Sequence, residues 1–362
     1  MTDVLGRADD GGISGALGTY RARDGSAGAA VEIDLDGPHA ALVVGKRGYG
    51  KSYTLGVLVE ELAAAAGVSP VVVDPMGAFR TFADVPGFSV VDEPRVSAGA
   101  LSPRAWCALL GLDHESSAGS LVWQAAAKTD TLAAMKEYVG NADAVQATRR
   151  TARNHLALAD SWGVFSPDGL TAADCLSGAT ATILDCSGYD AAPMNAVVRA
   201  VVEDLYRARV TDSVATLPWL VVDEAHAFFD GIAAPALRTV LTRGRRPGVS
   251  FVAATQRPAA LPEDAVSQAD ILVAHRLTSQ ADREALARAR PTYMHGPFTD
   301  RMPEKPGSAL VVDDATESVH AVQIRTRRVE HGGGSPSASA LTSETGEENE
   351  SPRPFESVKC VR

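Results

Sequence analysis

The chain has little of what marks secreted, metal-binding or membrane proteins. Its four cysteines, Cys107, Cys175, Cys186 and Cys360, have neither metal-ligand spacing nor the density of a small disulfide scaffold. No apolar run approaches the ~18 residues of a transmembrane helix, and the first ten residues lack the apolar centre of a signal peptide. We therefore expect a cytoplasmic protein without a membrane partner.

Positive charge is also scarce. The 362 residues have a net charge of −11, and only 6 of the 34 basic residues are lysines. Nucleic-acid-binding domains usually have the opposite balance, so DNA binding over the whole surface is disfavoured, whereas a basic pore or loop is still allowed. The hydrophobic content of 45% is ample for one large α/β domain or two ordinary ones.

Residues 45–52 read GKRGYGKS and match the phosphate-loop pattern G-x-x-x-x-G-K-[ST]. An apolar strand at residues 41–44 precedes this loop, and an apolar helical face follows it. Glycines let backbone N–H groups turn toward phosphate oxygens, and the N-terminus of the next helix attracts the same anion. The alternative is an ordinary glycine-rich turn, but the flanking strand and helix favour a nucleotide site.

The phosphate loop predicts a set of residues that contact ATP and Mg²⁺. Lys51 is expected to reach the β- and γ-phosphates, and the Ser52 hydroxyl is expected to ligate Mg²⁺. The full set predicted to bind the nucleotide is Gly45, Gly48, Gly50, Lys51, Ser52 and Tyr53.

Apolar strands alternate with helical segments along most of the chain, which predicts an α/β fold with a mainly parallel sheet. A C-terminal β-hairpin is expected at residues 309–324. Residues from about 97 to 165 lack strand signals and predict a helical insertion, with a helix start at Ser102 and Pro103. Buried strands are expected at residues 70–75, 181–185, 219–224, 250–255 and 271–274, and a short strand is expected at residues 89–91.

This pattern divides the chain into three parts. Residues 1–38 are expected to form a short N-terminal segment with one strand at residues 31–35. Residues 39–330 are expected to form one ATPase domain that contains the helical insertion. Residues 331–362 are rich in serine, glycine and glutamate, and predict a disordered acidic tail.

Asp223 and Glu224 end one of the predicted apolar strands. In phosphate-loop ATPases a carboxylate at this place holds Mg²⁺, usually through water, and a second one can activate the attacking water. Adjacent strand residues point to opposite faces, so the two carboxylates cannot act identically. We assign Asp223 to the metal and Glu224 to the catalytic base. The structural alternative is an acidic strand-to-helix turn with an N-cap.

Gln256 directly follows the next predicted strand, at residues 250–255. Ligand-binding residues of parallel sheets gather at the carboxyl ends of the strands, so Gln256 is expected to sense the γ-phosphate or position the attacking water. The alternative is a polar residue in an exposed loop.

Three arginines, Arg243, Arg245 and Arg246, precede the same strand. Arginine suits bidentate binding of phosphate oxygens. One of the three could therefore enter the site of a neighbouring subunit as a catalytic arginine finger. Contact with DNA phosphates and a solvated turn are the competing interpretations. Arg276, which follows the strand at residues 271–274, is a further candidate.

Four segments together resemble the HerA branch of the HerA–FtsK superfamily of ring-forming ATPases. They read GKRGYGKS (45–52), WLVVDEAHAFF (219–229), LTRGRRPGVSFVAATQRP (241–258) and ILVAHRLTSQADREAL (271–286). The likeness covers about residues 31–334, and residues 325–333 look like the basic, glycine-ended closing segment of the family. The resemblance implies a RecA-like core, a hexameric ring and ATP-driven movement of double-stranded DNA through its pore.

Two departures from the family pattern bear on function. HerA proteins usually carry an N-terminal β-barrel, for which the acidic start of this chain is too short, and this departure weakens the case for the nuclease partner of the family. Ala78 stands where the family commonly has a carboxylate. The expected function is an ATP hydrolase that translocates double-stranded DNA in repair or recombination, conjugation or genome packaging. The alternatives are an ATP-binding scaffold without translocation and a monomeric enzyme that acts on a small substrate.

Overall fold

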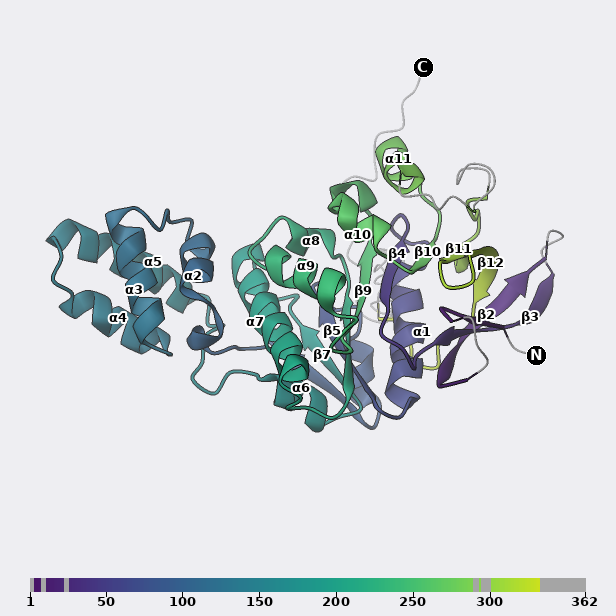
Figure 1. Ribbon diagram of the computed structural model, residues 1–362, viewed down its shortest axis with the longest axis horizontal. Coiled ribbons are helices and arrows are strands. Elements are labelled where there is room, and N and C mark those ends of the chain that lie inside the picture. The colour runs from purple at the N-terminus through teal and green to yellow at the C-terminus, as the bar shows by residue number, and fades with distance from the viewer. Residues whose placement is uncertain (1–2, 8–10, 23–25, 289–292, 294–300, 333–362) are drawn as a thin grey trace, which may run out of the picture. The chain divides into compact units, whose positions relative to one another are not determined.

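The computed structural model describes residues 3–7, 11–22, 26–288, 293 and 301–332, so nearly all of the predicted acidic tail lies outside the described residues. The described strands form one sheet with the order β1-β3-β2-β12-β11-β10-β4-β9-β8-β5-β7-β6 (Figure 1). They are β1 (Asp3–Leu5), β2 (Ser14–Arg21), β3 (Ala27–Asp34), β4 (Ala40–Val44), β5 (Val68–Asp74), β6 (Phe88–Asp92), β7 (Ala181–Asp185), β8 (Leu217–Val222), β9 (Ser250–Thr255), β10 (Ile271–Ala274), β11 (Ser308–Asp313) and β12 (Ser318–Ile324).

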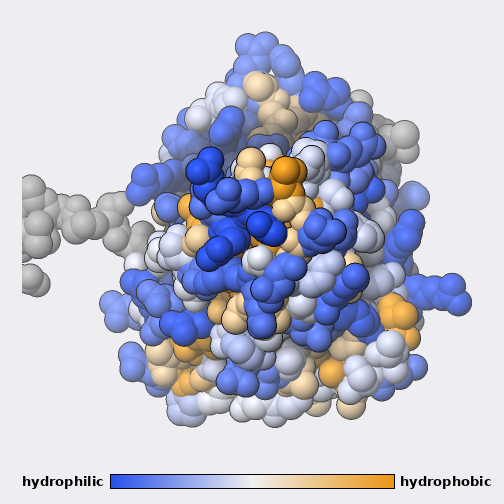
Figure 2. All heavy atoms as spheres, turned by 90° about the vertical axis from the view of Figure 1, so that its left-hand side faces the viewer, coloured by the Kyte–Doolittle hydropathy of each residue, from blue (hydrophilic) through white to orange (hydrophobic). Residues whose placement is uncertain are grey.

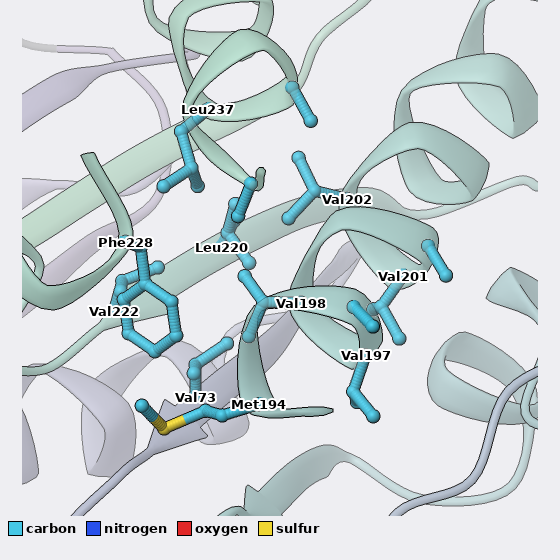
Figure 3. Packing of buried hydrophobic residues seen from close by; sticks show 14 of the residues in the cluster. Val73, Met194, Val197, Val198, Val201, Val202, Leu220, Val222, Phe228 and Leu237 are labelled. Carbon is cyan, nitrogen blue, oxygen red and sulfur yellow. The ribbon is translucent and has the colours of Figure 1, made fainter. Parts of the chain in front are cut away.

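The centre of the sheet is parallel, from β10 through β4, β9, β8, β5 and β7 to β6. Both faces of this centre are covered, which explains why its strands are continuously apolar. In β5, Val71 and Val73 join the core on one face, whereas Val72 joins the core on the other. Figure 3 shows the first of these cores, where Val198 of one long helix lies beside Leu220. The predicted α/β class with a mainly parallel sheet is confirmed.

Two helices show how the two faces are covered. Helix α1 supplies Leu55 and Leu62 to one core, and α7 supplies Val197 and Val201 to the other. The α-helices are α1 (Lys51–Ala64), α2 (Pro103–Leu109), α3 (Ser117–Lys128), α4 (Leu132–Asn141), α5 (Gln146–Ser161), α6 (Ala172–Ser177), α7 (Ala191–Val210), α8 (His226–Phe229), α9 (Ala234–Arg243), α10 (Glu263–Ser267) and α11 (Gln280–Arg288). Short 3₁₀ helices lie at Arg80–Asp84, Ala98–Ala100 and Pro258–Ala260.

The predicted helical insertion consists of α2 to α5, which follow one another between β6 and β7. The Ser102 hydroxyl accepts a hydrogen bond from the Ala105 N–H (3.2 Å) and Pro103 occupies the first turn, so the predicted helix start is confirmed. Figure 2 looks onto the side of the molecule at which these helices lie, and shows mainly hydrophilic residues with small separate apolar patches. Within the described part of the chain, no helix is both long and apolar enough to span a membrane.

The N-terminal residues form more structure than the single strand expected at residues 31–35. Strands β1, β2 and β3 continue the sheet, and β2 pairs antiparallel with β12 of the predicted C-terminal hairpin. Strand β2 is rich in glycine, serine and alanine, which have low strand propensity, so its sequence carries little signal. The close approach of the hairpin requires a small residue: a Cβ atom at Gly18 would lie 2.0 Å from the Gln323 carbonyl oxygen.

Candidate nucleotide-binding site

The phosphate loop connects β4 to α1 at the carboxyl edge of the parallel sheet. Gly48 and Gly50 have φ angles of 80° and 113°, which favour glycine, and Gly50 precedes the first turn of α1. Gly45 is tightly enclosed, because a Cβ atom there would lie 2.6 Å from the Cβ atom of His275. The structure thus accounts for the three glycines by conformation and by packing.

Lys51 and Ser52 begin α1, and Ser52 connects the loop to the end of β8. The Ser52 hydroxyl donates a hydrogen bond to Asp223 Oδ2 (2.7 Å), although the two residues are 171 positions apart in the chain. Both Lys51 and Asp223 are buried. The structure therefore brings together the two residues that the sequence assigns to Mg²⁺.

The donor atoms of this site suit Mg²⁺. A hydroxyl and a carboxylate are hard oxygen ligands, and protein Mg²⁺ sites commonly use one or two carboxylates together with substrate phosphates and water. No group of three or more His, Cys, Asp or Glu side chains placed to hold a metal occurs in the described part of the chain. A site that completes its ligand shell with nucleotide phosphates fits both observations.

Asp74, at the carboxyl end of β5, is a buried carboxylate to which the sequence analysis gave no role. It accepts hydrogen bonds from the N–H groups of Met76, Ala78 and Phe79, at 3.1, 3.1 and 2.8 Å, and so fixes the turn after β5. Burial raises the pKa of Asp74 to about 6, assisted by the charge of Asp223 and opposed by these N–H groups. Its position at the end of a strand, directly after three valines, is the signal that could have identified it.

Glu224 follows Asp223 with a φ angle of 45°, which is uncommon for a residue other than glycine. This conformation turns the chain after β8, and the Glu224 N–H donates to Asp223 Oδ1 (2.8 Å). Burial raises the pKa of Glu224, while Lys51 opposes the shift and Asp223 adds to it. A carboxylate with a raised pKa beside a lysine has the properties of a general base.

Gln256 directly follows β9 and is half-buried. A hydrogen bond from its main-chain N–H lowers the pKa of Glu224. The predicted sensor and the predicted base therefore lie at neighbouring strand ends. Two residues that the sequence analysis left without a role connect them: the Thr255 hydroxyl and His226 Nδ1 are 3.1 Å apart. Their only sequence signal is their position after or at the end of a strand.

His275 is fully buried behind the phosphate loop and was also missed as a separate site residue. Its Nδ1 donates to the Ser308 carbonyl (2.9 Å), so Nε2 is free to accept from the Thr54 hydroxyl at 2.9 Å. Burial lowers the pKa of His275 to about 4, and the neighbouring Lys51 acts in the same direction. A neutral imidazole therefore connects α1 to β10 and β11 beneath the loop.

The three arginines predicted as finger candidates lie at the amino edge of the parallel sheet, where its strands begin. They are Arg243, Arg245 and Arg246. They are exposed, and they end or follow α9, before β9 begins. The six residues of β9 put roughly 20 Å between these arginines and Gln256. The arginines are thus separated from the phosphate loop of their own chain. Arg276 lies closer, because its carbonyl accepts from the Lys46 N–H (2.8 Å).

Tyr53, predicted to contact the nucleotide, also contacts the closing segment at residues 325–332. Its hydroxyl accepts from the Arg327 N–H (2.7 Å), and its ring lies edge-on to the His331 ring, with centroids 5.7 Å apart. Arg325 forms ion pairs with Glu60 and Glu61 of α1 at 2.7 Å each. The closing segment is therefore fixed along the helix that begins at Lys51.

Comparison with known families identifies the chain. The family model DUF87, described as the central domain of helicase HerA, matches residues 25–205, which is half of the chain. The chain belongs to this family. The HerA–FtsK resemblance expected from the sequence is therefore confirmed, and with it membership of the HerA/FtsK-type phosphate-loop ATPases. A comparison with curated proteins finds no match.

Solved structures show the same fold. VirB4 of Thermoanaerobacter pseudethanolicus superimposes with a TM-score of 0.68 at 17% identity, covering 88% of this chain and 98% of that one. The bacterial conjugative coupling protein TrwB has a TM-score of 0.57 at 14% identity and covers 81% of this chain and 86% of its own. TrwB in complex with the non-hydrolysable GTP analogue GDPNP has a TM-score of 0.54 at 15% identity, covering 80% and 86%. The predicted RecA-like core is confirmed by this likeness.

Proposed function

We propose that this chain hydrolyses ATP and uses the free energy to move double-stranded DNA. The observation that carries the proposal is the meeting of Lys51, Ser52 and the Asp223–Glu224 pair at one edge of the sheet, with Ser52 bonded to Asp223. Family membership supports nucleotide binding and turnover. The coupling proteins of conjugation share the fold and support the choice of DNA as the substrate that is moved.

Each residue has a distinct task in the proposed reaction. Lys51 neutralises the β- and γ-phosphates, and Ser52 and Asp223 would hold a Mg²⁺ ion that would supply further positive charge there. Glu224 accepts the proton of the attacking water, so its carboxylate must be ionised. Gln256, beside Glu224, contacts the γ-phosphate when ATP is bound. Loss of the γ-phosphate changes the position of Gln256 and therefore of the end of β9.

A ring gives the three arginines a role. Because β9 separates them from the phosphate loop of their own chain, they act on ATP only from a neighbouring subunit, in an assembly that places the amino edge of one sheet against the carboxyl edge of the next. We propose a homohexamer of this kind. Its pore is the place where DNA phosphates meet basic side chains on a protein whose net charge is −11.

The same net charge favours a second candidate, a nucleotide-switched scaffold that binds ATP without moving DNA. The two functions are separated by steady-state ATPase rates measured with and without long double-stranded DNA at matched ionic strength. Strong stimulation by DNA is expected, and it should weaken steeply as salt rises. Hydrolysis without stimulation contradicts the DNA motor, and ATP binding without hydrolysis supports the scaffold.

A further inference from the structure

The imidazole of His226 lies between the proposed base and the end of β9. His226 Nδ1 is 3.3 Å from Glu224 Oε2 and 3.1 Å from Thr255 Oγ1. The side chains of His226 and Glu224 are only 18% and 19% exposed, so water competes weakly for these atoms. One ring nitrogen therefore faces two oxygen atoms that belong to different strand ends.

A neutral imidazole nitrogen can satisfy only one of these neighbours at a time. Burial lowers the pKa of His226, with Arg257 and Lys51 acting in the same direction, so the ring carries one proton at neutral pH. If Nδ1 carries that proton, it donates to Glu224 or to Thr255; if it does not, it accepts from the Thr255 hydroxyl. Glu224 Oε2 receives no hydrogen bond from the described residues, although Nδ1 is within ion-pair distance.

Thr255 is itself tied to the segment that contains Gln256. The Thr255 hydroxyl accepts from the Arg257 N–H (3.0 Å), so a movement of Gln256 changes the position of this hydroxyl. The loop after β8 is tied to the same strand, because the Ala225 N–H donates to the Ala254 carbonyl (2.8 Å). The loop after β8 therefore stays bonded to β9, while the Thr255 hydroxyl follows the segment that contains Gln256.

We propose that His226 is a positioning residue. It orients the Glu224 carboxylate, and its orientation depends on whether the Thr255 hydroxyl at the end of β9 is hydrogen-bonded to its Nδ1. The inference rests on the proposed ATPase function and adds a residue to it. When the β9 end draws the Thr255 hydroxyl away from His226, Nδ1–H turns to Glu224 and fixes the base toward the attacking water. When Thr255 donates to Nδ1, Glu224 has no donor from this ring and is not aligned.

The first test compares His226→Ala with His226→Asn in steady-state ATPase assays of the full chain. Asparagine places a polar nitrogen or oxygen close to the Nδ1 position, whereas alanine removes it. We expect His226→Ala to lower kcat about 10-fold, a part of the roughly 10²–10⁴-fold that a positioned base contributes, with KM for ATP changed less than about twofold. His226→Asn should recover most of kcat. His155→Ala, on α5 of the insertion, is the matched control.

The second test asks whether His226 acts through Glu224. In the Glu224→Gln background, adding His226→Ala should lower the residual turnover no further, and Thr255→Val with His226→Ala should be less than additive. Additive losses, an unchanged kcat in His226→Ala, or equal defects in the alanine and asparagine variants overturn the proposal. If the wild-type chain does not hydrolyse ATP, the proposed function fails as well, whereas hydrolysis that is indifferent to His226 overturns this inference alone.

Discussion

Two buried histidines lie at opposite edges of the parallel sheet, and their surroundings make one of them positively charged and leave the other neutral. His39, just before β4, lies between Asp34 and Asp270 at 2.9 and 3.0 Å. Burial disfavours its charge, but the hydrogen bonds to the two carboxylates outweigh burial and raise its pKa to about 9. His275, just after β10, has only a hydroxyl and a carbonyl as partners, and burial lowers its pKa to about 4.

The hydrogen bonding of buried polar groups differs between the two edges of the sheet, and it suits the amino edge to stability and the carboxyl edge to ligand binding. At the amino edge both nitrogens of His39 are hydrogen-bonded, and Asp34 pairs in addition with Arg7. At the carboxyl edge the charges of Lys51 and Glu224 are not paired with each other, and Glu224 Oε2 has no hydrogen-bond partner among the described residues. An imidazole with both nitrogens hydrogen-bonded stabilises the fold, whereas a carboxylate oxygen without a partner beside the phosphate loop is available to a ligand or to water.

The largest expected effect is the loss of nucleotide binding at the carboxyl edge. Lys51→Ala removes the buried cation that faces the phosphates, so ATP binding and turnover should fall to the background level. Titration with a fluorescent ATP analogue measures binding, and Lys136→Ala on α4 serves as the control. Normal hydrolysis by the Lys51 variant contradicts the assignment of the phosphate loop.

The arginines test whether the two edges meet between subunits. One of Arg243, Arg245 and Arg246 is expected to be the arginine finger, and its substitution by alanine should lower kcat on the order of 10³-fold. This effect is expected although the three residues lie far from the phosphate loop of their own chain. Mixing that variant with Lys51→Ala subunits should restore part of the activity, because each inactive chain supplies what the other lacks. Arg153→Ala on α5 is the control. If no mixture recovers activity, the arginines do not act in trans.

The proposed base gives a smaller effect with a defined pH dependence. Glu224→Gln keeps the shape of the side chain and removes its basicity, so kcat should fall about 10²-fold or more while ATP still binds. Because burial raises the pKa of Glu224, wild-type activity should decline as pH falls through that raised pKa, and the variant should lack this decline. Glu137→Gln on α4 is the control. A variant that retains wild-type turnover places the base elsewhere.

The amino edge should affect stability rather than turnover. His39→Ala leaves Asp270 without its cation and Asp34 with Arg7 alone, and should lower the free energy of unfolding by about 3 kcal/mol. The pKa of His39 is about 9 when folded against 6.5 ordinarily, so its contribution is complete below pH 6.5 and is lost as pH rises through 9. Denaturant unfolding of wild type and variant at both limits measures this difference. A loss that is equal at both limits shows that His39 stabilises by packing alone.

Much of the carboxyl edge could be predicted because its signals are local. The phosphate loop is one continuous pattern, and Asp223, Glu224 and Gln256 each end or follow an apolar run. By contrast, His226 and Thr255 are residue types that occur in any turn, and their contact joins two different strand ends. Asp74 also ends an apolar run, and the turn that it holds follows directly in the chain. The N-terminal strands were underestimated for a related reason: β2 is specified mainly by pairing with β3 and β12, and only weakly by its own residues.

By itself, the sequence determined the α/β class and the places along the chain of the parallel strands and of the nucleotide loop, and it predicted roles for the carboxylates that follow one of these strands. Periodicity and short motifs depend only on neighbours in the chain. Only the tertiary structure decided which histidine is charged, which two strand ends His226 connects, and that the arginines and the phosphate loop lie at opposite edges of the sheet. Protonation and distance depend on burial and on contacts between residues far apart in sequence, and these exist only once the chain is folded.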